Sequence, residues 1–214
     1  MLNIETLVLG PVATNTYIVA DTESKLAVVI DPAWDGDILV KKICQLGWKV
    51  QSIWITHAHF DHFGGLADLL SGLNLSEEDD FFVGLHPKDR NLWKVKGGAI
   101  MFGVPMKSVP KPGHDFNEGE MLSVGKYQFQ VHHTPGHSSG HVIFHCQSER
   151  ILLSGDLIFK QGIGRTDLLG GSYSTLMDSI QKYVLPLPDD TRILSGHGPE
   201  TTVGDERREN PFLK

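Results

Sequence analysis

The sequence predicts an α/β layered architecture, in which helices cover β-sheets and a functional site lies along one edge of the sheets. Apolar, β-branched runs alternate with helical patterns in both halves of the chain. Several of these runs end directly in His or Asp, which are residue types that bind metal ions. Because such ends lie at the same edge of a layered α/β fold, we expect the ligands to converge there.

Composition favours one domain, residues 1–214, that acts on a small molecule. A chain of 214 residues with 40% hydrophobic content can bury a sizeable core. Its net charge of -7 disfavours binding to nucleic acid and to anionic membranes, because both attract basic surfaces. We therefore expect a small-molecule substrate and no nucleic-acid or membrane partner.

The chain shows no targeting signal. Its first 14 residues lack a Lys or Arg before the apolar positions, and no apolar run is long enough for a membrane span. Cys44 and Cys146 form no C-x-x-C pair, which suits a reducing cytosol. We expect a cytoplasmic protein in which both cysteines are buried as small hydrophobic residues, although the sequence leaves a disulfide open.

The first third of the chain predicts three strands and a helix. Apolar residues dominate positions 2–19 with a break at Gly10 and Pro11, residues 15–20 form a second strand, and residues 21–25 form a polar turn. Residues 26–30 are continuously apolar, as in a strand buried on both faces. A helix follows whose apolar positions are spaced four and three apart, at Leu39, Ile43 and Leu46, with Asp35 as its N-cap and Gly47 at its end.

The stretch that the rest of the chain serves is residues 53–62, an apolar run closed by four possible metal ligands. His57 and His59 are two residues apart, so in an extended chain they project from the same face. Asp61 and His62 follow where the chain must turn, before a helix expected over residues 66–70. Three His and one Asp within six residues indicate a metal site rather than a chance surface cluster.

Two later segments are less regular. Residues 76–80 form a charge run and predict a solvated loop. Residues 86–116 scatter aromatic residues among glycines and prolines, and they form either a loop that shapes a pocket or a long connection.

Three strands of the second half each end in a further ligand type. The runs at 127–131, 151–155 and 193–196 lead to His137, Asp156 and His197. Between the last two, Leu176, Ile180 and Val184 recur at helical spacing, with Ser174 as the expected N-cap and Pro186 beyond the end.

The seven candidate ligands exceed what one tetrahedral ion needs and suggest two metals; they are His57, His59, Asp61, His62, His137, Asp156 and His197. Asp156 is the expected bridge because a carboxylate has two oxygens. His57 and His59 would join His137 on one ion, while Asp61 and His62 would join His197 on the other. We expect zinc, although iron and manganese accept the same ligand types, and we expect Asp61 and Asp156 to serve catalysis directly.

Two adjacent divalent ions lower the pKa of a bridging water from about 15.7 to about 7, which supplies hydroxide at neutral pH. The same ions polarise a carbonyl and stabilise an oxyanion. Such a site hydrolyses esters, thioesters, lactams or lactones. The remaining histidines either lack a strand-end position or duplicate one that is already filled; they are His86, His114, His132, His133, His141 and His145. Of these, His141 is expected to support the ligands from behind.

The order and spacing of four motifs resemble the metallo-β-lactamase fold superfamily, specifically its glyoxalase II-like hydrolases. The motifs are Thr-His-Ala-His-Phe-Asp-His at 56–62, Thr-Pro-Gly-His at 134–137, Ser-Gly-Asp at 154–156 and Gly-His-Gly at 196–198. The segment 162–167 and the tail 198–213 look like the short bacterial branch called type II glyoxalase II. The resemblance covers nearly the whole chain and implies a four-layer αββα sandwich with the two-metal assignment above.

The resemblance implies hydrolysis of a small thioester such as S-lactoylglutathione. Full-length glyoxalase II carries a carboxyl-terminal helical domain that helps hold glutathione, and this chain ends about where that domain would begin. The sequence therefore leaves open which thiol carries the acyl group of the substrate. Arg165, paired in sequence with Asp167, could hold a substrate carboxylate or could form a structural ion pair with its neighbour.

Three rival activities remain. A persulfide dioxygenase of the same fold would bind one iron through His57, His137 and Asp156 and leave the other four ligands spare. A lactonase would use the same dinuclear site, and a metal-binding module without turnover would show saturated coordination. Neither cysteine falls on a motif, which disfavours an antibiotic-degrading β-lactamase.

Overall fold

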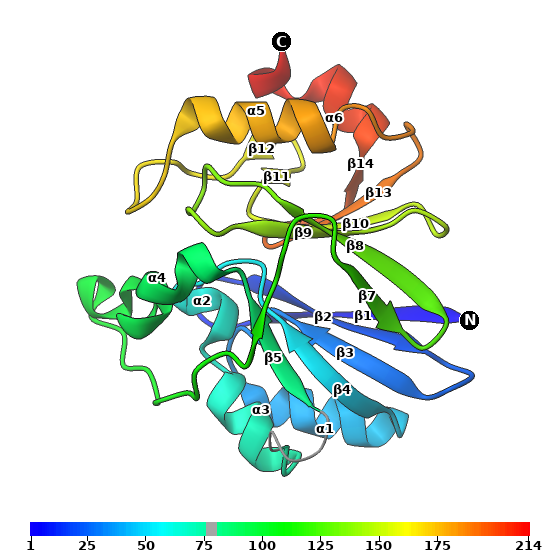
Figure 1. Ribbon diagram of the computed structural model, residues 1–214, viewed down its shortest axis with the longest axis vertical. Coiled ribbons are helices and arrows are strands. Elements are labelled where there is room, and N and C mark those ends of the chain that lie inside the picture. The colour runs from blue at the N-terminus through cyan, green and yellow to red at the C-terminus, as the bar shows by residue number, and fades with distance from the viewer. Residues whose placement is uncertain (76–80) are drawn as a thin grey trace.

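The computed structural model describes residues 1–75 and 81–214 and contains two six-stranded sheets packed face to face (Figure 1). The strand orders are β1-β2-β3-β4-β5-β6 and β14-β13-β10-β9-β8-β7. The charged loop expected at residues 76–80 lies outside the described residues.

The first sheet comes from the first half of the chain. Strands β1 to β3 are antiparallel, whereas β3 to β6 run parallel. The bounds are Leu2–Leu9 (β1), Thr14–Asp21 (β2), Leu26–Ile30 (β3), Lys49–Trp54 (β4), Phe82–Leu85 (β5) and His114–Asp115 (β6). The prediction that residues 26–30 form a buried strand is confirmed, since Ala27 to Ile30 are all buried. Strand β5 has no counterpart among the strands predicted from the sequence.

The second sheet comes from the second half and is antiparallel except where β10 runs parallel to β13. Its strands are Met121–Val124 (β7), Tyr127–His133 (β8), Val142–Cys146 (β9), Ile151–Gly155 (β10), Arg192–Ser195 (β13) and Thr201–Thr202 (β14). A small hairpin of β11 (Ile158–Phe159) and β12 (Gly162–Ile163) follows β10. Strands β8, β10 and β13 confirm the three predicted strands that precede candidate ligands.

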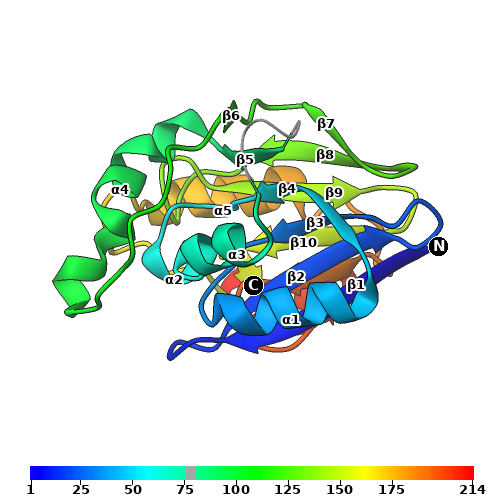
Figure 2. The same cartoon turned by 90° about the horizontal axis from the view of Figure 1, so that it is seen from below.

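Helices cover both outer faces, which gives the expected αββα layers. Helices α1 (Gly36–Leu46) and α3 (Leu66–Gly72) lie against the first sheet, as Figure 2 shows from below. Helices α5 (Tyr173–Tyr183) and α6 (Val203–Glu209) lie over the second. Separate apolar clusters fill the space under each helical layer and between the sheets. The α/β fold class and its four layers are therefore confirmed.

Aromatic side chains hold the two sheets together. The Trp54 ring of β4 lies 5.6 Å from that of Phe129 and 5.0 Å from that of Phe144, both in the second sheet. All three side chains are fully buried. Full burial of one such side chain stabilises the fold by about 2 kcal/mol relative to exposure. This packing fixes how the two sheets lie against each other, and so where the ends of their strands meet.

Helix α1 begins and ends where the sequence predicts, with Asp35 at the N-cap position, but the Asp35 side chain does not cap the helix. Asp35 has a positive φ of 50° and makes no side-chain cap; its carboxylate instead accepts a hydrogen bond from the backbone N–H of Gly10, 3.0 Å away. Gly47 takes the predicted left-handed conformation. Cys44 on this helix is exposed, contrary to expectation, because it lies off the face that contacts the sheet; Cys146 is buried and both cysteines are unpaired.

Helix α5 starts earlier than predicted. Its N-cap is Ser172, whose hydroxyl accepts from the N–H of Thr175, and Ser174 lies inside the first turn. The register of the apolar face is nevertheless confirmed, because Leu176, Ile180 and Val184 are all buried.

The irregular segment 86–116 contains short helical turns, followed by a stretch without regular structure at residues 104–112. The turns are η2 (Pro87–Asp89), α4 (Arg90–Lys94) and η3 (Lys96–Phe102), and α2 (Phe60–Phe63) lies beside η3. None of the helices in the described ranges 1–75 and 81–214 is long and apolar enough to cross a membrane.

Candidate metal centre

The first four candidate ligands follow β4 at the edge where β3, β4 and β5 all end. Two backbone bonds across this edge hold the strand: the N–H of Asp31 donates to the Trp54 carbonyl and that of Ile55 to the Gly84 carbonyl. His57 and His59 lie in the extended segment after β4, and Asp61 and His62 lie in α2. One strand-to-helix corner thus presents four side chains, as predicted.

The second half brings its three ligands to the same edge. His137 follows β8, Asp156 follows β10, and His197 follows β13. Asn15 of β2 anchors the last loop, since its side-chain amide donates to the carbonyls of Ser195 and Gly198 at 2.8 Å each. The two sheets therefore position one site jointly.

Three imidazoles face one another in the first cluster. Nε2 of His137 lies 3.1 Å from Nε2 of His57 and 2.8 Å from Nδ1 of His59. All three side chains are buried. Three ring nitrogens turned toward a common point form a set that could hold one metal ion.

Asp61, His62 and His197 form a second cluster. Oδ2 of Asp61 lies 3.3 Å from Nε2 of His197 and 3.6 Å from Nε2 of His62. This trio could hold another ion. These two trios correspond to the expected partition, and a third possible group, His57, His62 and Asp156, joins the two clusters.

Asp156 lies between the clusters. One of its oxygens, Oδ2, is 3.5 Å from Nε2 of His137 and 3.7 Å from Nε2 of His197, and the other, Oδ1, is 3.4 Å from Nε2 of His62. A carboxylate that reaches both clusters is placed as a bridge would be.

The donor set fits metal ions. Nε2 of His62 and Oδ1 of Asp156 are buried and have no hydrogen-bond partner in the described structure. Leaving a buried polar atom unpaired costs about 1–3 kcal/mol. Both atoms face the point where the clusters meet, so a bound cation would satisfy them.

Three of the candidate histidine ligands have a hydrogen-bond partner on Nδ1, the ring nitrogen that faces away from the site. His57 Nδ1 lies 3.0 Å from the Thr56 hydroxyl, His62 Nδ1 lies 2.8 Å from Oδ2 of Asp31, and His137 Nδ1 lies 2.8 Å from the carbonyl of Arg165. A carboxylate and a carbonyl only accept, so His62 and His137 carry their proton on Nδ1. When these rings are neutral, Nε2 of each keeps its lone pair directed at the site.

Burial has the largest effect on the pKa values of the histidines in the first cluster. Burial lowers the pKa of His57 well below its usual value, and the neighbouring rings of His62 and His137 lower it further. Burial, together with His137, also lowers the pKa of His59 to about 3. These rings are neutral at physiological pH, which is the state that binds metal.

The second cluster is electrostatically different. Burial alone would lower the pKa of His62, but the carboxylates of Asp156, Asp61 and Asp31 outweigh it and raise that pKa well above its usual value. Burial has the largest single effect on Asp156 and would raise its pKa, yet His62, His137 and His197 together lower that pKa well below its usual value. The carboxylates therefore attract positive charge, and a metal ion bound here would displace a proton from His62.

Asp31 is a site residue that the sequence analysis missed. Besides its contact with His62, its carboxylate accepts from the N–H of Thr56 at 2.8 Å and from the Thr56 hydroxyl at 2.6 Å. It directly follows β3 and has a positive φ of 49°. Its place after an apolar strand, the same position that marked Asp156, was the signal available in the sequence.

His141 supports the site as expected. Its Nε2 accepts from the backbone N–H of Asp156 at 3.1 Å, and its Nδ1 lies 2.8 Å from the Thr134 hydroxyl. The other five histidines lie outside the ligand groups. His86 stacks on His133 with ring centroids 4.1 Å apart, for example.

Asp89 ties two ligand loops together and was also missed. Its carboxylate accepts from the N–H of Ala58, the hydroxyl of Ser138 and the N–H of Gly140, at 3.0, 2.7 and 2.6 Å. Ala58 separates His57 from His59, and Ser138 follows His137. Burial raises the pKa of Asp89, against the effect of these donors.

A pocket of about 390 Å³ opens over the two clusters. Phe60, Phe102 and Phe159 contribute to its apolar wall, and Gly97 lines it beside Phe102. The segment 86–116 therefore shapes this pocket, which was one of its two interpretations. Arg165 also lines the pocket, although its guanidinium forms a two-bond ion pair with Asp167 at 2.8 and 2.7 Å.

Comparison with known proteins identifies relatives along nearly the whole chain. A family model described as "Metallo-beta-lactamase superfamily" matches residues 9–197, which include all seven candidate ligands. "Probable metallo-hydrolase YqgX" of Bacillus subtilis is 36% identical over 95% of this chain and 94% of its own. "Hydroxyacylglutathione hydrolase GloC" of Haemophilus influenzae is 36% identical over 99% of this chain and 98% of its own.

Two solved structures share the fold. The crystal structure of "BLEG-1 B3 metallo-beta-lactamase" has a TM-score of 0.89 at 38% identity and covers 99% of each chain. That of "TTHA1623 in a di-iron-bound form" has a TM-score of 0.87 at 38% identity, over 98% of this chain and all of the other.

Proposed function

The chain belongs to the metallo-β-lactamase superfamily, and from this membership and its histidine and aspartate clusters we propose that it is a metal-dependent hydrolase of small thioesters. S-lactoylglutathione is the first substrate to test, because one relative is named a hydroxyacylglutathione hydrolase. The proposed cofactor is a pair of divalent ions. Zinc is the first candidate, with iron and manganese as alternatives, since one similar structure is named as a di-iron form.

The observation that carries the proposal is the pair of ligand trios with Asp156 between them. His57, His59 and His137 would hold one ion, Asp61, His62 and His197 would hold the other, and Asp156 would touch both. A single-iron dioxygenase needs His57, His137 and Asp156 alone. The convergence of four further ligands on the same point favours the dinuclear hydrolase.

Bound divalent ions supply Lewis acidity and lower the pKa of water. The residues of the chain position the reaction around them. Asp61 lines the pocket, and its Oδ2 accepts from the Thr14 hydroxyl at 3.3 Å, which orients the carboxylate beside His197. We assign Asp61 and Asp156 to holding the attacking water and accepting its proton. The leaving thiolate needs no acid, because the pKa of a thiol is about 8.5.

The pocket suits a small acyl group with a polar carrier. Phe60 and Phe102 form an apolar wall with ring centroids 5.3 Å apart. Arg165, with 55% of its side chain exposed, is the candidate contact for a substrate carboxylate, provided that the substrate competes with Asp167.

A β-lactam is a second candidate substrate, because a protein named as a B3 metallo-β-lactamase is 38% identical over 99% of this chain. Amide and thioester hydrolysis both pass through a tetrahedral oxyanion, so one site could catalyse both. The relative values of kcat/KM for a thioester and for a β-lactam decide which class the pocket prefers.

The experiment measures S-lactoylglutathione hydrolysis, nitrocefin hydrolysis and metal content on one purified preparation, beside oxygen uptake with glutathione persulfide. We expect thioester turnover and about two metal equivalents, following the ligand number each ion needs. His57→Ala should lose turnover and metal. His145→Ala, a half-buried histidine outside the ligand groups, is the matched control and should keep both. Oxygen uptake without thioester turnover would identify the dioxygenase instead.

A further inference from the structure

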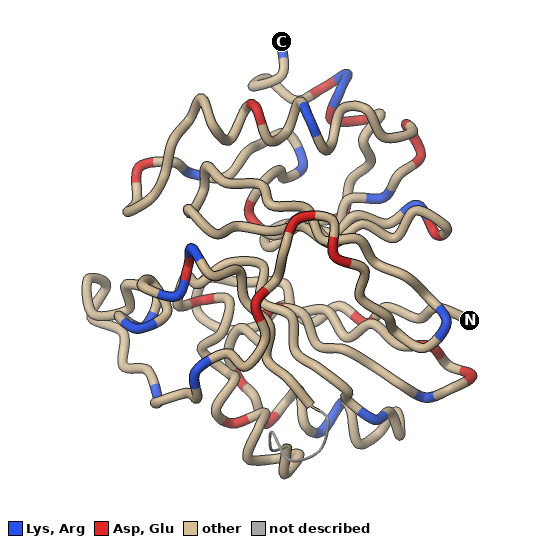
Figure 3. The backbone as a smooth tube through the Cα atoms, in the orientation of Figure 1, with Lys and Arg blue, Asp and Glu red and all other residues tan. Residues whose placement is uncertain are grey.

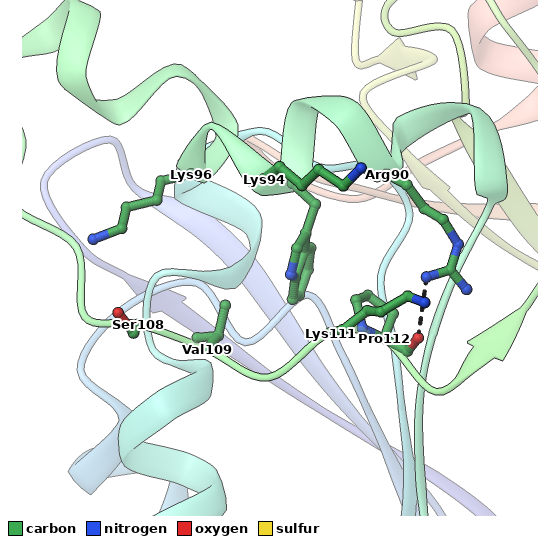
Figure 4. Close-up of a pocket in the computed structure, with 8 residues that line it drawn as sticks. Arg90, Lys94, Lys96, Ser108, Val109, Lys111 and Pro112 are labelled. Atoms are coloured by element: carbon green, nitrogen blue, oxygen red, sulfur yellow. Dashed lines mark hydrogen bonds between the residues drawn. The ribbon is translucent and has the colours of Figure 1, made fainter.

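A second pocket lies between α4, η3 and the chain that returns from η3 toward β6 (Figure 4). It encloses about 500 Å³ and shares no described lining residue with the metal pocket. Four of its eight lining residues are cations, namely Arg90, Lys94, Lys96 and Lys111, and the described lining includes no acid.

This gathering of positive charge opposes the charge of the whole chain. The sequence carries 19 basic and 26 acidic residues. Figure 3 shows basic positions grouped along α4, η3 and the returning chain. A concave surface lined by one sign of charge concentrates ligands of the opposite sign.

Two of the four cations are already engaged and are held in place. The guanidinium of Arg90 pairs with Asp115 through its Nε at 2.8 Å and donates to the Pro112 carbonyl at 3.3 Å. Lys96 Nζ donates to the carbonyl of Met106 at 2.8 Å. These contacts form the pocket's frame by tying the returning chain to α4 and η3.

The other two cations have capacity for a ligand. Lys94 and Lys111 are exposed, and neither makes an ion pair or a side-chain hydrogen bond within residues 1–75 and 81–214. Both line the same pocket, one from α4 and one from the returning chain (Figure 4). An ammonium group offers three donors, so the pair can hold one anionic group from two sides.

The rest of the lining is mostly apolar. Trp93 lines the pocket, and its ring stacks on that of Phe63 with centroids 4.1 Å apart and planes 14° apart. Val109 and the buried Pro112 complete the apolar surface. Ligand pockets typically combine such apolar walls with a few polar groups that fix orientation.

We propose that this pocket binds a small organic anion, with its charged group between Lys94 and Lys111 and its apolar part against Trp93 and Val109. The site is additional to the metal centre and does not depend on the proposed hydrolysis. Both features of the ligand are required: the charge engages the two lysines, and the apolar body displaces water from the wall.

Titration calorimetry with three probes separates these requirements: benzenesulfonate, the neutral benzenesulfonamide and inorganic sulfate. We expect benzenesulfonate to bind at least about tenfold more tightly than either other probe, and added salt to weaken it. Equal affinity for the sulfonamide would overturn the role of the lysines. Equal affinity for sulfate would overturn the role of the apolar wall.

Matched double variants locate the site. Lys94→Gln with Lys111→Gln should weaken benzenesulfonate binding about tenfold or more. Lys25→Gln with Lys41→Gln removes the same charge from exposed positions elsewhere and should leave the affinity unchanged. The indole N–H signal of Trp93 should shift on titration of the wild type and not of the first variant. Equal weakening in both variants, or no shift at Trp93, would overturn the proposal.

Discussion

Oδ2 of Asp31 lies 2.8 Å from Nδ1 of His62, so a carboxylate at the end of β3 orients a candidate ligand in α2, the helix that follows β4. The two strands are parallel neighbours, which is why residues 31 positions apart meet. The same carboxylate also receives two hydrogen bonds from Thr56. Asp31 therefore holds the first ligand motif in place from behind.

Asp31→Asn should lower metal affinity about 10- to 100-fold, since an amide can present either a donor or an acceptor to His62 and loses the charge. A chelator competition titration measures the change. Asp35→Asn is the control and should keep wild-type affinity. Among the described residues, the Asp35 carboxylate accepts a hydrogen bond only from the backbone N–H of Gly10. An Asp31→Asn protein that binds metal normally would show that the contact is incidental.

Asp156→Ala should abolish most activity and lower metal occupancy at both positions, because one carboxylate lies within 3.4–3.7 Å of ligands in both clusters. Elemental analysis per protein chain gives the occupancy. Loss of a single equivalent would mean that Asp156 serves one ion and does not bridge.

Asp89→Ala should destabilise the fold and lower kcat together. It leaves the buried N–H groups of Ala58 and Gly140 unsatisfied, at about 1–3 kcal/mol each. Ser138→Ala removes one of the three donors to the Asp89 carboxylate and leaves the other two. It should therefore lower the free energy of unfolding less than Asp89→Ala does. Thermal unfolding ranks the stability of the two variants. A fall in melting temperature that is equal or larger in Ser138→Ala would contradict the proposed role of Asp89 in holding the two loops together.

Gly97→Ala should disturb the pocket wall. Its new Cβ would lie 2.2 Å from the backbone N of Phe60 and 2.6 Å from the carbonyl of Ala58, both in the ligand loop. Gly98→Ala provides a close control, because Gly98 also has a positive φ, 79° against 60°, and its Cβ would meet nothing within 4 Å. Both pay backbone strain of about 1–2 kcal/mol. We expect a fall of about tenfold or more in kcat/KM only for Gly97→Ala; equal kinetics would contradict this.

The sequence predicted the parts of the site that follow strands with a clear apolar pattern. His57 to His62, His137, Asp156 and His197 all stand directly after such strands, and the structure brings them together. Asp31 shares this position, but its role depends on the parallel pairing of β3 with β4, which no local pattern reveals. Asp89 lies in a segment without periodicity, and its three partners come from two distant loops.

Helix caps were the weakest part of the prediction, once for a local reason and once because of a tertiary contact. Ser172 and Ser174 are equally good N-caps by residue type, and the extended backbone of residue 172 decides between them. Asp35 was available as a cap, but the nearby N–H of Gly10, from a different part of the sheet, takes its carboxylate. Tertiary contacts of this kind override local preference.

If two ions share the site, the metal content of the His62→Ala variant should reveal it. His62 belongs to the second cluster and lies outside the three ligands of the single-iron alternative. The dinuclear account predicts that wild type holds about two equivalents and His62→Ala about one, by the ligand number that each ion needs. His59→Ala should likewise hold about one, and His145→Ala should match wild type. A His62→Ala protein that retains the full wild-type metal content would contradict the dinuclear assignment.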